Sequence, residues 1–159
     1  MKYQSICVAV ALQRYLDFTP VALRQRSLAM VLAHAFGARL TILSVNAPVD
    51  LLPGLETTEE KLDRFSTPLL EDGFEVQRIL RTGKPSTEIL EVVEEVHADL
   101  LIMGSPSKRG ALDVGLSSTV RSLPHDLDIP LLLIRPTATE TDRAHELIIP
   151  RYPMVFPYG

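Results

Sequence analysis

The sequence predicts a single α/β domain built on a parallel sheet. Its 159 residues are 46% hydrophobic, which is enough for a substantial core in one domain. Short apolar runs alternate along the chain with longer segments of helical periodicity. Strands that alternate with helices need crossover connections, which make the strands parallel and place helices on both faces of the sheet.

Five segments have the composition of strands. They are rich in Val, Ile and Leu and comprise residues 5–10, 39–45, 74–81, 99–104 and 129–136. The first and fourth alternate little between polar and apolar residues, as expected of strands covered on both faces. The third alternates more, which indicates a position nearer a sheet edge.

Four segments between these strands are predicted to be helical. They place apolar residues on one face and comprise residues 20–37, 57–73, 84–98 and 119–125. Asp17 or Thr19 can cap the first helix, and Thr57 or Thr58 can cap the second. We expect the second helix to kink or to end early at Pro68, because proline cannot donate a backbone hydrogen bond.

We divide the chain into an α/β domain, residues 1–136, and a C-terminal extension, residues 137–159. The extension ends in LIIPRYPMVFPYG, where prolines separate apolar and aromatic residues. It cannot form a regular helix and is too apolar to lie wholly in water, so we expect it to pack across a partner subunit or over a sheet edge. The alternative is a frayed terminus.

Charge and hydropathy exclude two classes of partner. A formal net charge of -4 does not fit the basic face that binds nucleic acid. No apolar stretch approaches the roughly 20 residues that cross a bilayer. The N-terminus has no signal-peptide pattern. We therefore expect a cytoplasmic protein with no membrane or nucleic-acid partner.

Dedicated catalysis is not expected. The four His residues are scattered, none forms a His/acid pair with metal-ligand spacing, and no G-x-S-x-G elbow is present. Cys7, the single cysteine, lies inside an apolar run and is expected to be a core residue without a redox role. The sequence thus predicts a binding protein that is not an enzyme.

The stretch IMGSPSKRGALDVGLSSTV, residues 102–120, is a candidate phosphate-binding loop. Gly104 ends a strand, and ligands of open parallel sheets bind beyond such ends. A glycine there permits positive φ and a close approach of the backbone to a ligand. The polar residues that could hold the anion, by charge or at a helix start, are Lys108, Arg109, Ser117, Ser118 and Thr119. The same residues also fit an ordinary helix cap and a solvated loop.

The chain resembles the universal stress protein family in its order of elements and in three stretches. They are GARLTILSV, TGKPSTEILEVVEE and ADLLIMGSPSKRGALDVGLSSTVRSLPHDLDIPLLLIRP, and the resemblance covers residues 5–136. It implies an open five-stranded parallel sheet of the adenine nucleotide α-hydrolase type, with strand order 3-2-1-4-5. It also implies a regulatory protein and a homodimer through the edge strand from Pro130 to Arg135, and it leaves a further protein partner unidentified.

The resemblance also implies where ATP, with Mg, would bind. The ATP-binding members have Gly, two residues, Gly, nine residues, then Gly followed by Ser or Thr. Here these three positions hold Gly104, Ser107 and Ser117, followed by Ser118. Serine would be strained wherever positive φ is needed. The alternative is therefore a dimeric interaction module of the same fold that binds no nucleotide.

The family places an Asp just after the first strand, near the adenine end of the nucleotide. Asp17 falls at this position, after the extra residues ALQRYL. Either Asp17 still faces the pocket, or Tyr15 and Leu16 fold into it. We favour the simpler interpretation that Asp17 is a helix N-cap. The candidate nucleotide-binding residues are Ala11, Asp17, Val45, Met103, Gly104, Ser107, Lys108, Gly110, Ser117, Ser118 and Thr119.

Overall fold

A five-stranded parallel sheet forms the centre of the computed structural model, which describes residues 3–13, 15–46, 55–105, 123 and 125–137. The strand order is β3-β2-β1-β4-β5, and every pairing is parallel. The predicted fold class and strand order are therefore confirmed. The strands are β1 (Ser5–Ala9), β2 (Arg39–Asn46), β3 (Val76–Thr82), β4 (Leu100–Gly104) and β5 (Leu131–Ile134).

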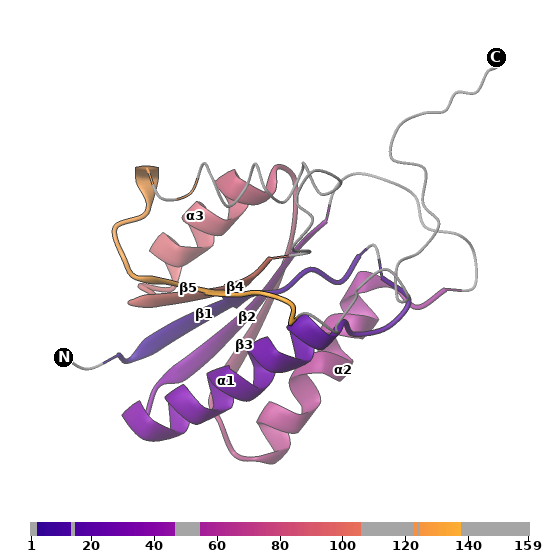
Figure 1. Ribbon diagram of the computed structural model, residues 1–159, viewed down its shortest axis with the longest axis horizontal. Coiled ribbons are helices and arrows are strands. Elements are labelled where there is room, and N and C mark those ends of the chain that lie inside the picture. The colour runs from indigo at the N-terminus through magenta and orange to yellow at the C-terminus, as the bar shows by residue number, and fades with distance from the viewer. Residues whose placement is uncertain (1–2, 14, 47–54, 106–122, 124, 138–159) are drawn as a thin grey trace.

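Helices cover both faces of this sheet. Figure 1 shows α1 (Pro20–Phe36) and α2 (Thr58–Glu71) on one face and α3 (Pro85–Glu95) on the other. The N-cap of α1 is Thr19, whose hydroxyl accepts a hydrogen bond of 3.0 Å from the backbone N–H of Ala22. The interpretation of Asp17 as this cap is wrong. Most of the fourth predicted helix, residues 119–125, lies outside the described residues.

The capping residues explain why α2 begins at Thr58. Thr57 and Glu60 form a capping box, in which each side chain accepts a hydrogen bond from the other residue's backbone N–H. The helix continues through Pro68 to Glu71, so the predicted early end is wrong. Pro68 removes one backbone donor near the last turn. The burial of Phe65 on the sheet keeps this segment in place.

The sheet separates two hydrophobic cores. In β1, Ile6 and Val8 pack in the core beneath α1 and α2, whereas Cys7 packs in the core beneath α3. Alternate residues of a strand point to opposite faces, so a strand covered on both sides is apolar throughout. Cys7 is fully buried, and burial raises the pKa of its thiol to about 12. Such a thiol is protonated at neutral pH, as a core residue without a redox role would be.

Hydrogen bonds of polar side chains hold the amino end of β1 in place. The carboxylate of Asp99 accepts hydrogen bonds from the backbone N–H groups of Gln4, at 2.9 Å, and Ser5, at 3.2 Å. The hydroxyl of Ser5 donates to the carbonyl of Val96 at 3.1 Å. These contacts tie β1 to the turn between α3 and β4.

None of the described helices has the length and hydrophobicity that a membrane span requires. The extension from residue 138 onward lies outside the described residues. The proposed boundary after residue 136 and the packing of the extension therefore stay predictions.

Candidate functional site

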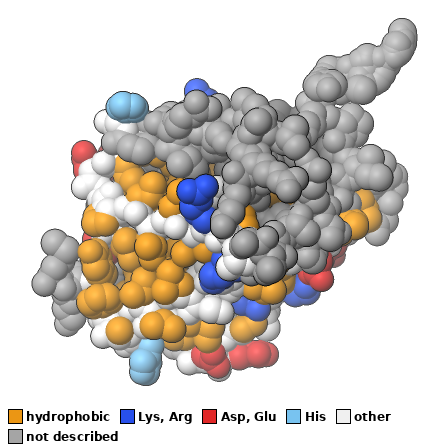
Figure 2. Space-filling model, viewed as in Figure 1, with side chains coloured by type: hydrophobic (Ala, Val, Ile, Leu, Met, Phe, Trp, Pro, Cys, Tyr) orange, Lys and Arg blue, Asp and Glu red, His pale blue; other side chains and the backbone are white. Residues whose placement is uncertain are grey.

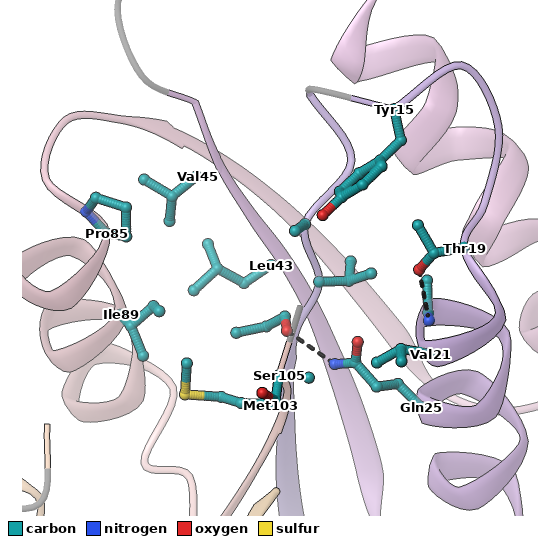
Figure 3. Close-up of a pocket in the computed structure, with 15 residues that line it drawn as sticks. Tyr15, Thr19, Val21, Gln25, Leu43, Val45, Pro85, Ile89, Met103 and Ser105 are labelled. Atoms are coloured by element: carbon teal, nitrogen blue, oxygen red, sulfur yellow. Dashed lines mark hydrogen bonds between the residues drawn. The ribbon is translucent and has the colours of Figure 1, made fainter. Parts of the chain in front are cut away.

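A cavity of about 100 Å³ lies at the carboxyl ends of β1 and β4, beside the start of α1. The strand order reverses between β1 and β4, which is the usual ligand position in open parallel sheets. In Figure 3, Tyr15 and Gln25 lie on one side of the cavity and Val45 and Ile89 on the other. The lining residues are Ala9, Val10, Ala11, Tyr15, Thr19, Val21, Ala22, Gln25, Leu43, Val45, Pro85, Ile89, Met103, Gly104 and Ser105.

The structure brings together the four described candidates that follow or end strands. Ala11, Val45, Met103 and Gly104 all line the cavity, because the carboxyl ends of parallel strands meet at one edge of the sheet. Asp17 does not line it. The other candidates lie outside the described residues, so their contacts stay predictions; they are Ser107, Lys108, Gly110, Ser117, Ser118 and Thr119.

Gly104 serves helix packing. The described glycines with positive φ are Gly37, Gly73 and Gly83, so Gly104 does not adopt the positive φ that glycine permits. A Cβ atom at Gly104 would lie 2.6 Å from Cγ1 of Val21 and 2.7 Å from Oε1 of Gln25. The missing side chain therefore lets α1 pack closely against the end of β4.

Gln25 is a lining residue that the sequence-based prediction missed. Its side chain is buried, and its Nε2 donates a 2.8 Å hydrogen bond to the carbonyl of Ala9. This bond holds the end of β1 against α1, as the dashed line in Figure 3 shows. The signal in the sequence was an amide one helical turn after Val21, on the apolar face of the helix.

The extra residues between β1 and α1 bring Tyr15 into the site. Tyr15 is buried and lines the cavity, whereas the neighbouring Leu16 is 53% exposed. The side chain of Asp17 is 64% exposed, and its carboxylate accepts hydrogen bonds from the backbone of Phe18 and from Arg64. Of Tyr15, Leu16 and Asp17, Tyr15 lines the pocket, and the carboxylate of Asp17 binds Arg64 outside it.

Lys61 of α2 forms hydrogen bonds with the backbone of this loop. The residue is only 2% exposed, and its ammonium donates to the carbonyls of Leu12, at 3.1 Å, and Tyr15, at 2.6 Å. Burial lowers the pKa of Lys61, and the nearby carboxylate of Glu56 partly opposes this shift. Nothing in the sequence around Lys61 predicts its burial, since it lies in the polar stretch TTEEKLDR.

Arg64, one turn further along α2, fixes the end of the same loop. Its guanidinium donates to both carboxylate oxygens of Glu56, at 2.9 and 2.8 Å, and to Asp17 at 3.1 Å. These hydrogen bonds lower the pKa of Glu56 and raise that of Arg64. The guanidinium also lies 4.1 Å from the ring centre of Phe18.

The described lining of the cavity carries no formal charge. Apolar side chains form most of it, and Tyr15, Thr19, Gln25 and Ser105 supply hydroxyl and amide groups. Such a lining suits a flat, neutral group with hydrogen-bonding edges. Across the described residues, no group of three or more His, Cys, Asp or Glu could hold a metal ion.

The model of the universal stress protein family matches residues 2–135. The chain belongs to this family. Universal stress protein MJ0577 of Methanocaldococcus jannaschii is 28% identical over 80 residues, which are 50% of this chain and 49% of that protein. The match thus spans about half the length of the curated relative.

Solved universal stress proteins share the fold. One in complex with cAMP is 20% identical and has a TM-score of 0.61, over 84% of this chain and 98% of that chain. Another, from Arabidopsis thaliana with AMP bound, is 19% identical and has a TM-score of 0.60, over 90% of this chain and 99% of that chain. At these identities, the similarity shows the universal stress protein fold.

Proposed function

We propose that this universal stress protein binds an adenine nucleotide and acts as a regulatory binding protein without turning over a substrate. The observation that carries the proposal is the cavity at the reversal of strand order, whose described lining is uncharged. The related proteins solved with cAMP and AMP hold ligands that share the adenine group. Adenine is flat and uncharged, with ring nitrogens and an amino group at its edges, and so matches this lining.

The size of the cavity fits part of a nucleotide. Its volume of about 100 Å³ is below the roughly 300–1,000 Å³ of pockets for whole ligands. We assign the cavity to the base, with the ribose and phosphates outside it. The phosphates would then meet the loop after β4, and the residues proposed to hold them are Gly104, Ser107, Lys108, Gly110, Ser117, Ser118 and Thr119. Mg would enter with the phosphates of ATP.

Calorimetric titration of ligand-free protein with AMP, cAMP and Mg·ATP tests the proposal. We expect micromolar binding of at least one of them. Ala11 is exposed and lines the cavity, so Ala11→Phe is expected to weaken this binding by about tenfold or more by occupying the space of the base. Ser27→Phe adds the same side chain to an exposed position of α1 outside the cavity and serves as the control.

Two results would contradict nucleotide binding at this site. One is the absence of heat with millimolar nucleotide. The other is equal binding by Ala11→Phe and the wild type, which would place the nucleotide elsewhere. The first result would favour the alternative function, a dimeric interaction module without a nucleotide.

The surface of α1 and β5 supports a role in protein association. Figure 2 shows hydrophobic side chains gathered over these two elements, which include the exposed Leu23 and Val31 and the partly buried Leu131 to Leu133. β5 is an edge strand, and such an edge pairs readily with another chain. Members of the family commonly form homodimers. We propose a cytoplasmic homodimer that pairs through residues 130–135.

Replacing Leu133 with proline is expected to dissociate this dimer. The carbonyls of Pro130 and Ile134 accept hydrogen bonds from the backbone N–H groups of Leu101 in β4 and of Ser105 just after it, so the backbone of Leu133, at the alternate position, points to the open edge. Proline there removes the outward N–H and leaves the bonds to β4 intact. Leu133→Ala removes the side chain but keeps the N–H and is expected to remain a dimer. Sedimentation equilibrium decides, and a dimeric Leu133→Pro variant would contradict the proposed interface.

A further inference from the structure

The loop between β1 and α1 is held by one face of α2. Lys61, Arg64 and Phe65 are spaced three and four residues apart and therefore lie on the same side of this helix. Lys61 binds two carbonyls of the loop, Arg64 binds Asp17, and the ring of Phe65 meets that of Phe18 edge to face at 5.2 Å. The loop is thus held at four of its described residues, which are Leu12, Tyr15, Asp17 and Phe18.

The contact of Lys61 determines where Tyr15 lies. A buried ammonium needs hydrogen-bond acceptors, because an unpaired charge in the interior is very unfavourable. The carbonyls of Leu12 and Tyr15 supply them, and Leu12 also accepts from the N–H of Tyr15 at 3.3 Å, which closes a turn. The position of the Tyr15 backbone, and with it the direction of its ring, therefore depends on Lys61.

Tyr15 contributes what the rest of the described lining lacks. It is the one aromatic residue among the described lining residues, and the hydroxyl end of its ring points into the cavity in Figure 3. A phenol offers a flat face for stacking and a hydroxyl that both donates and accepts. Asp17, the nearest carboxylate along the chain, is turned outward to Arg64.

We propose that Tyr15 contacts the adenine base in the cavity and that Lys61 is its positioning residue. The inference rests on the proposed function and names the residue that would contact the base. The hydroxyl of Tyr15 can meet either a ring nitrogen or the amino group of adenine. The ring of Tyr15 can also stack on the flat face of the base.

Calorimetric dissociation constants for AMP test the role of Tyr15. Tyr15→Phe, which loses only the hydroxyl, is expected to bind AMP about 2- to 12-fold more weakly, the range for one hydrogen bond. Tyr15→Ala is expected to bind AMP roughly 5- to 140-fold more weakly, the range for one stacked base. Leu16→Ala, at the exposed neighbouring position, is the matched control and is expected to behave as the wild type.

A double-mutant cycle tests the role of Lys61. Lys61→Met keeps the buried stem but removes the donor, and it is expected to weaken AMP binding in the wild-type background. If Lys61 acts through Tyr15, the same change in a Tyr15→Ala background is expected to have less than about a twofold effect. Lys61→Arg keeps a charged donor and is expected to restore most of the lost affinity. Where Lys61→Met fails to fold, by circular dichroism, Lys61→Gln, which loses the charge but keeps a neutral donor on a shorter side chain, replaces it in both backgrounds.

Each outcome separates the two proposals. If all Tyr15 variants bind AMP as tightly as the wild type, the role of Tyr15 is overturned. The proposal of nucleotide binding is then unaffected. An equal effect of the Lys61 variants in both backgrounds overturns the positioning role. If the wild type does not bind AMP but the Tyr15→Ala variant does, then Tyr15 blocks the cavity. This result overturns the role of Tyr15 as a contact of the base. If neither the wild type nor any variant binds AMP, both proposals are overturned.

Discussion

Gly104→Ala is expected to lower the free energy of unfolding by about 1–3 kcal/mol, the usual effect of overfilling a packed interior. The new Cβ would lie 2.6 Å from Cγ1 of Val21 and 2.7 Å from Oε1 of Gln25. Neither atom can move away freely. Val21 is buried in the first turn of α1, and Gln25 is held by its hydrogen bond to Ala9. Either α1 shifts from β4 or this hydrogen bond breaks.

Urea denaturation followed by circular dichroism measures this effect. Val21→Ala removes one of the two clashing atoms, so the double variant Gly104→Ala/Val21→Ala is expected to be more stable than the sum of the single changes predicts. Because Val21 and Gln25 also line the cavity, the same displacement is expected to weaken ligand binding. An unchanged unfolding midpoint for Gly104→Ala would show that α1 does not pack on β4 as described.

Phe65→Ala is expected to have the largest effect on stability, a loss of about 3–5 kcal/mol. Phe65 is fully buried and meets Phe18 edge to face. The guanidinium of Arg26 lies 5.1 Å from its ring centre and donates to its backbone carbonyl. Removal of the ring leaves a cavity between α1 and α2 and releases Phe18, which ends the loop that carries Tyr15.

The matched control is Leu70→Ala in the same helix. Leu70 is 44% exposed, so its truncation is expected to change the free energy of unfolding by about 0.5 kcal/mol or less. Both variants can be compared by the same urea denaturation experiment. A loss of less than about 1 kcal/mol for Phe65→Ala would show that the packing between the two helices contributes little to stability.

The fold could be predicted because its signals are local. Apolar runs and helical spacing located all eight described elements, and the alternative caps Thr57 and Thr58 marked the start of α2. The helix continues past Pro68, without the predicted early end, for a physical reason. One missing backbone bond near a helix end is a small loss beside the burial of Phe65 and Leu69, and tertiary packing outweighs it.

The candidate site could be predicted only in part. Ala11, Val45 and Met103 could be placed because the topology brings strand ends together. Lys61 could not be found from its neighbours along the chain, because its partners are carbonyls 46 and 49 residues away. The place of Tyr15 depends on that contact, so the sequence left two alternatives open. Gly104 was recognised as a special position, but the reason lies in α1, which contacts β4 only in the folded chain.

The apolar character of both sides of β1 has a consequence for how the strand finds its correct alignment. If β1 slipped by one residue against its neighbouring strands, Cys7 and Ala9 would replace Ile6 and Val8 in the core beneath α1 and α2. All four side chains are apolar, so hydrophobicity alone would hardly distinguish the two registers. Directional groups at the strand ends make that distinction. After such a slip, the buried amide of Gln25 and the buried hydroxyl of Ser44, which donates to the carbonyl of Val10 at 2.9 Å, would lose their acceptors. The side-chain amide of Gln25, which lines the cavity, thus also disfavours misalignment of the central strand β1 during folding.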